Sequence, residues 1–158
     1  MPVQGALFSD ESDRKADASA NVRDVSPASF VGRVFEQALR ASGRFDDIRL
    51  LEGEPADDAQ PRPDVVVRVT VLTWGLVRVR EGDPDLMSVF ADVRAEMVAR
   101  QTGVALWQDN EDVTGPERLP LKAFTADRAF TRRQLLDVLE RAGRRLASEL
   151  VYAQGAGR

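Results

Sequence analysis

The chain has 158 residues, of which 43% are hydrophobic and 30% are charged, and its formal net charge is −4 at pH 7. It contains no Cys and no His, which excludes disulfides, thiolate nucleophiles, cysteine-based zinc sites and any Ser-His-Asp triad. Lys is nearly absent and the acidic balance gives no global positive field, so neither P-loop chemistry nor nucleic-acid binding is expected.

The length predicts a single domain spanning residues 1–158, with the folded core at residues 27–152. Pro2–Phe8 reads as a short strand. Residues 9–24 are dense in Ser, Asp, Ala and Asn, which predicts a flexible loop. No apolar run reaches the roughly 18 residues that a membrane-spanning helix needs.

The first predicted helix begins at Ser26, a good N-cap residue, followed by Pro27 at the first helical position. Gly43 is placed to end this helix in the left-handed conformation. Apolar residues recur between these ends at helical spacing; they are Phe30, Val31, Val34, Phe35, Ala38 and Leu39. A short strand is predicted at Ile48–Leu51, and a proline-rich loop at Glu52–Pro63.

Two long alternating runs, Asp64–Arg80 and Leu86–Arg100, predict a pair of half-buried antiparallel strands. If Glu81–Asp85 is the turn, Arg80 faces Leu86, and this register puts the odd-numbered residues of both strands on the core face. The opposite face then gathers one apolar cluster, Leu72, Trp74, Leu76 and Phe90. This register assumes that Gly75 carries no β-bulge, which would turn one half of the strand over.

A three-residue turn at Gln101–Gly103 predicts a second hairpin with its third strand at Val104–Gln108. That pairing puts Trp107 opposite Met97, on the core face. The segment Asp109–Lys122 is polar and reads as turns. Thr131 and Gln134 fit a capping box, which predicts a long amphipathic helix from there to about Tyr152.

The expected fold is therefore an α/β domain of the α+β type. It is a two-layer sandwich, in which a mixed, mainly antiparallel sheet of about four or five strands carries two helices on one face.

The cluster of Leu72, Trp74, Leu76 and Phe90 is the best candidate for a functional surface, because an apolar island containing Trp on a polar face is typical of partner-binding patches. The alternative is that the N-terminal segment or a loop covers it. No other constellation predicts chemistry. The acidic run Asp109–Asp112 fails the EF-hand pattern, and the arginines of the last helix are expected to pair with acids such as Asp137, Glu140 and Glu149.

Four strings resemble elements of small bacterial envelope lipoproteins, a group that includes ABC-transport auxiliary lipoproteins, curli-export-type lipoproteins and the TolB amino-terminal-like fold. They are VGRVFEQALRASGRF (Val31–Phe45), DVVVRVTVLTWGL (Asp64–Leu76), MSVFADVRAEMVARQTGVALWQ (Met87–Gln108) and the segment Leu119–Val151. The resemblance implies an α/β sandwich with no catalytic residue, in a periplasmic accessory protein tethered to the outer membrane.

The sequence thus predicts a non-catalytic envelope protein that binds an envelope partner or itself, with no cofactor, no metal and no nucleic acid. Contact with a membrane is expected only through a lipid anchor that this sequence does not carry. A native start at Met1 would instead place the protein in the cytoplasm. The alternative is a small-ligand or lipid carrier with a cleft between the last helix and the sheet, and an acid-dependent hydrolase is the least favoured reading.

Overall fold

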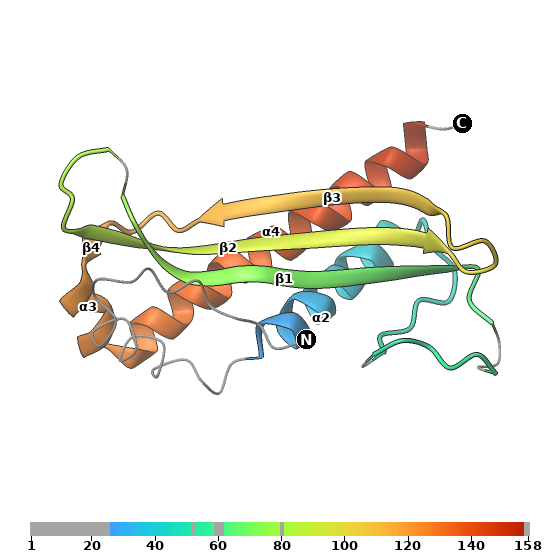
Figure 1. Ribbon diagram of the computed structural model, residues 1–158, viewed down its shortest axis with the longest axis horizontal. Helices are drawn as coiled ribbons and strands as arrows, with labels where there is room; N and C mark the ends of the chain where they lie inside the picture. The colour runs from blue at the N-terminus through green and yellow to red at the C-terminus, as the bar shows by residue number, and fades with distance from the viewer. Residues whose placement is uncertain (1–25, 52, 59–61, 80, 157–158) are drawn as a thin grey trace.

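The computed structural model describes residues 26–51, 53–58, 62–79 and 81–156. The predicted strand at Pro2–Phe8 and the predicted loop at residues 9–24 lie outside these residues. The elements are α2 (Pro27–Ser42), β1 (Val65–Arg78), β2 (Leu86–Ala99), β3 (Ala105–Thr114), β4 (Leu119–Pro120), α3 (Leu121–Ala126) and α4 (Arg128–Ala156) (Figure 1).

The architecture is the expected α+β sandwich. Strands β1, β2 and β3 form an antiparallel meander in that spatial order, and the short β4 pairs with β2 beyond the end of β3. Helices α2 and α4 lie on the same face of the sheet (Figure 1). We call this covered side the inner face and the opposite side the outer face. Within the described residues every pair of strands is antiparallel, so this part of the sheet is not mixed as predicted.

The hydrophobic core lies between the inner face and the two helices. On β2, the alternating residues Met87, Val89, Ala91, Val93, Ala95 and Met97 are all buried, as the period of two predicted. The stripes Val31, Phe35 and Leu39 of α2 and Leu135, Leu139, Leu146 and Leu150 of α4 cover them. Trp107 faces Met97 as predicted and packs, partly buried, against this core.

Helix α2 has the predicted bounds. Pro27 stands at its first turn, and Gly43 ends it with a φ of 63°, where its amide donates to the Arg40 carbonyl. The Ser26 side chain makes no capping hydrogen bond, since its hydroxyl donates to Ser29 Oγ instead.

Three segments differ from the sequence-based expectation. Ile48–Leu51 is not a strand, and β3 extends to Thr114, so the acidic run Asp109–Asp112 lies in a strand rather than in a loop. Helix α4 begins before Thr131. The Asp127 carboxylate accepts the Phe130 amide at its start, while the Thr131 hydroxyl is buried and donates to the Phe124 carbonyl of α3.

The packing of α2 on α4 depends on Gly143. A Cβ atom there would lie 3.1 Å from Val34 Cγ1 and 3.4 Å from the Val31 carbonyl oxygen. Helix α2 therefore packs closely against the backbone of α4 at a position where α4 has no side chain.

Candidate functional site

The predicted cluster of Leu72, Trp74, Leu76 and Phe90 is divided between the two faces of the sheet. Trp74 and Leu76 lie opposite Ala91 and Val89 of β2, and both pack against the hydrophobic core on the inner face. The prediction that these four residues share the outer face is therefore wrong.

Two single-residue differences cause this split. The Val79 amide donates to the Leu86 carbonyl at 2.9 Å, so Val79 rather than Arg80 faces Leu86 and the hairpin register moves by one residue. The register then shifts again between Val71 and Thr73, because Leu72 is an extra residue with no partner in β2.

The two shifts add up in one half of β1 and not in the other. Beyond the bulge, Val67 and Val69 face Met97 and Ala95, so they lie on the core face as predicted. Between the bulge and the hairpin only the first shift applies, and the even-numbered Trp74 and Leu76 turn inward.

Phe90 lies on the outer face, opposite Gly75. Gly75 has a φ of 143°, a backbone conformation that residues other than glycine rarely adopt. A Cβ atom built there would meet no heavy atom within 4 Å. Phe90 and Leu72 are both half-buried. On β2 the outer face beyond Phe90 is polar, with Asp92, Arg94 and Glu96, whereas Val77 of β1, opposite Ser88, is an apolar neighbour of Phe90 on that face.

Strand β1 lies at one edge of the described sheet. The Arg100 amide donates to the Asp64 carbonyl at 3.0 Å, and antiparallel pairing alternates between inward and outward backbone groups. Val65, Val67, Val69 and Val71 therefore direct their backbone N–H and C=O groups away from β2. After the bulge, Trp74 and Leu76 do so. Among the described residues no strand pairs with β1 on this side.

Trp74 carries an unsatisfied donor at this edge. Its indole Nε1 is shielded from solvent and finds no hydrogen-bond acceptor in the described part of the chain. Leaving a buried donor unpaired costs about 1–3 kcal/mol, and Trp usually finds a partner for this group when it is buried.

A short segment, residues 53–58, crosses to the outer face beside β1, and we call it the strap. Glu54 pairs with Arg68, with Nε–Oε1 at 2.5 Å and Nη2–Oε2 at 3.3 Å. Arg100 Nη2 donates to the carbonyls of Pro55 and Ala56 and to the Asp57 carboxylate, each at 3.3 Å.

This pairing determines the local electrostatics of the strap. The hydrogen bond from Arg68, together with its charge and that of Arg100, holds the pKa of the Glu54 carboxyl below its usual range. The same contact raises the pKa of Arg68.

Several charged residues of α4 form ion pairs. Asp137 and Glu140 form ion pairs with Arg141 and Arg144 along α4, each at 2.8 Å, as predicted, whereas Arg145 lies 3.6 Å from Glu111 of β3. The acidic run of β3 alternates between the two faces, since it lies in a strand. Within the described ranges, no group of three or more acidic residues is placed to hold a metal ion.

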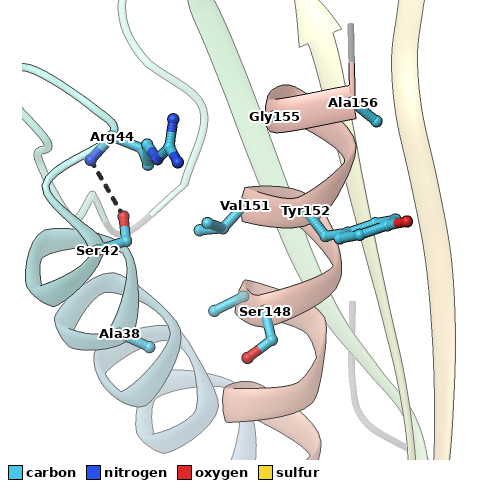
Figure 2. A pocket seen from close by; sticks show the side chains of 9 residues that line it. Ala38, Ser42, Arg44, Ser148, Val151, Tyr152, Gly155 and Ala156 are labelled. Atoms are coloured by element: carbon cyan, nitrogen blue, oxygen red, sulfur yellow. Dashed lines mark hydrogen bonds between the residues drawn. The ribbon is translucent and has the colours of Figure 1, made fainter.

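A groove of about 540 Å³ lies between the C-terminal ends of α2 and α4 (Figure 2). It differs in position from the predicted ligand cleft, because the space between α4 and the sheet is filled by core side chains. Its lining residues from the helices are mostly small or apolar; they are Ala38, Ser42, Ala147, Ser148, Val151, Tyr152, Gly155 and Ala156. Arg44 follows α2 and lines the groove as well.

Sequence reasoning missed this groove. The signal was present in the small residues Ala38 and Ser42, four positions apart, and in Ala147, Ser148 and Gly155 on α4. These residues lie on two helices that are far apart in the sequence. That their small side chains face each other and form a groove is visible only in the packed structure.

The described helices contain none that is long and apolar enough to cross a membrane. No family model and no curated protein matches the chain. Among solved structures, one described as that of a "putative lipoprotein from Caulobacter crescentus" is similar to this chain, with 13% sequence identity and a TM-score of 0.47, covering 90% of this chain and 98% of that one.

Proposed function

We propose that this protein is a non-catalytic accessory protein of the bacterial cell envelope that acts by strand addition along the free edge of β1. The observation that carries the proposal is the row of outward backbone groups from Val65 to Leu76. An unpaired strand edge is a template for another strand, because main-chain hydrogen bonds supply affinity without any requirement for a particular sequence.

A second copy of the chain is the simplest occupant of this edge. In an antiparallel β1–β1 pair centred on Val69, the backbone N–H and C=O groups that point away from β2 in one copy face the same groups of the other copy. It puts Arg68 opposite Thr70 of the second copy and Val67 opposite Val71, so no like charges stand directly opposite each other. An extended strand of an envelope partner would use the same groups.

The four residues of the predicted patch take different parts in this proposal. Trp74 and Leu76 contribute outward backbone groups, Leu72 interrupts the edge as the bulged residue, and Phe90 belongs to the outer face. The envelope location rests on the resemblance of the chain's four strings to envelope lipoproteins.

The test uses a proline at the centre of the proposed pair. Val69→Pro removes an outward N–H and leaves the hydrogen bonds between β1 and β2 intact, since those use the even-numbered residues of this half. Val69→Ala is the matched control, because it loses similar packing and keeps the N–H.

Sedimentation velocity over a range of concentrations should show reversible association of the wild-type chain and of Val69→Ala. Val69→Pro should remain monomeric with an unchanged circular dichroism spectrum. Equal association of all three chains would remove the β1 edge from consideration, and a wild-type chain that stays monomeric throughout would exclude the second copy as its occupant.

A further inference from the structure

The groove between α2 and α4 has a distinct physical origin. The helices pack closely at Gly143, where a Cβ atom would lie 3.1 Å from Val34, and nearer their C-terminal ends small side chains leave a groove between them. Ala147 is buried at the base, while Ala38 and Val151 are half-buried. The apolar lining is therefore a stable part of the fold and is only partly filled by its own side chains.

Among the described residues that line the groove, Arg44 is the one with a positive charge. Figure 2 shows the Arg44 side chain extending from the end of α2 towards α4, near Val151. The Arg44 amide donates to Ser42 Oγ at 3.2 Å, which fixes the backbone of the residue. In the described part of the chain, no carboxylate pairs with its guanidinium.

Arg40, in the last turn of α2, is already paired with Glu36, and the helix ends that flank the groove contribute charge of the opposite sign. The C-terminal ends of α2 and α4 flank it, and helix C-termini carry partial negative charge. Any preference for an anion must therefore come from Arg44, whose full positive charge and five N–H donors suit a carboxylate.

We infer that this groove binds a free single-chain fatty acid, with the alkyl chain along the apolar lining and the carboxylate on Arg44. The volume of about 540 Å³ is within the range of sites for small molecules. This site goes beyond strand addition at β1, from which it is independent, and it places the carrier function between the two helices.

The probe is dodecanoate, measured by isothermal titration calorimetry against dodecyltrimethylammonium, which has the same chain length and the opposite charge. Arg44→Gln removes the cation, and Arg33→Gln, an exposed arginine of α2 that does not line the groove, is its control. Gly155→Leu fills the groove at a position where a Cβ atom meets no heavy atom within 4 Å, and the neighbouring exposed Gln154→Leu is its control.

We expect saturable one-to-one binding of dodecanoate that is about tenfold weaker in Arg44→Gln, since charge-assisted hydrogen bonds carry this much affinity. Gly155→Leu should abolish binding, and both control variants should bind like the wild type. Val69→Pro should also bind like the wild type, so that failure of strand addition and failure of this site can be told apart.

Four results of the binding measurements would overturn the inference. They are the absence of saturable binding, equal affinity for the two probes, unchanged affinity in Arg44→Gln, and binding only to phospholipid vesicles, which would mean a lipid surface. A sedimentation coefficient that falls in Gly155→Leu would assign the groove to a second copy and would equally overturn it.

Discussion

Gly115 shows how little room the end of the sheet leaves for a side chain. Its amide donates to the Val89 carbonyl at 2.8 Å, where the chain leaves β3. A Cβ atom there would lie 2.6 Å from Val89 Cγ2 and 3.6 Å from Val138 of α4. Since Val89 and Val138 are both buried, neither can move without disturbing the core.

Gly115→Ala should therefore lower the free energy of unfolding by about 1–3 kcal/mol, the usual cost of overpacking a core. Urea denaturation followed by circular dichroism measures it. Gly155→Ala is the control and should not destabilise the fold, because its Cβ meets open space in a helix. A Gly115→Ala chain as stable as the wild type would contradict the close contact with Val89.

Asp92 and Asp112 are direct neighbours on the outer face, as register partners in β2 and β3. The Asn110 side-chain amide donates to Asp92 Oδ1 at 2.6 Å and so stabilises one of the two charges. Like charges directly opposite each other in a sheet repel, by an amount in the range of about 0.2–1 kcal/mol.

Asp112→Asn should thus raise the free energy of unfolding by a few tenths of a kcal/mol, and about 1 M salt should reduce this gain because it screens the repulsion. Urea denaturation at low and high salt provides the comparison. A variant that is less stable than the wild type at both salt concentrations would show that the Asp112 carboxylate makes a favourable contact instead.

At the scale of elements, the strap is held by ion pairs that depend on pH. Because Arg68 lowers the pKa of Glu54, the contribution of this pair is present at neutral pH and is lost as the pH falls through the lowered pKa. Both side chains are exposed, so loss of this ion pair at low pH changes the placement of the strap rather than the stability of the fold.

Arg68→Gln should raise the pKa of Glu54 towards its usual range, and an NMR titration of the Glu54 side-chain carboxyl measures the change. Arg49→Gln is the control, since Arg49 pairs with Asp47 at 3.0 Å. The assignment of the lowered pKa to Arg68 fails if both variants titrate alike.

The sequence predicted the long elements well and the junctions less well. The strict alternation from Met87 to Ala99 determines which side chains of β2 face the core. Pro27 and Gly43 mark the two ends of α2. Around the bulge, however, β1 is apolar on both parities, with Val71, Leu72, Trp74, Leu76 and Val77 in one run. Alternation cannot choose a register there, and the candidate patch depended on that choice.

At the scale of the whole molecule, the expected sandwich is confirmed because its layers follow from the amphipathic patterns alone. The free edge, the strap and the groove follow from contacts between segments that no local pattern connects. Arg100 reaches Pro55 and Ala56, and the groove requires Ala38 and Ala147 to face each other. Such pairs become visible only when the helices and strands have been packed.

The contact of α2 with Gly143 has a consequence for the order in which the molecule assembles. The hairpins of the meander close between neighbours in the sequence, which favours their early formation, whereas α2 must meet a helix near the other end of the described chain. Until α4 has been synthesised, the stripe of Val31, Phe35 and Leu39 has no lasting cover. A nascent chain would therefore expose the apolar side of this helix, and the docking of α2 on α4 would complete folding.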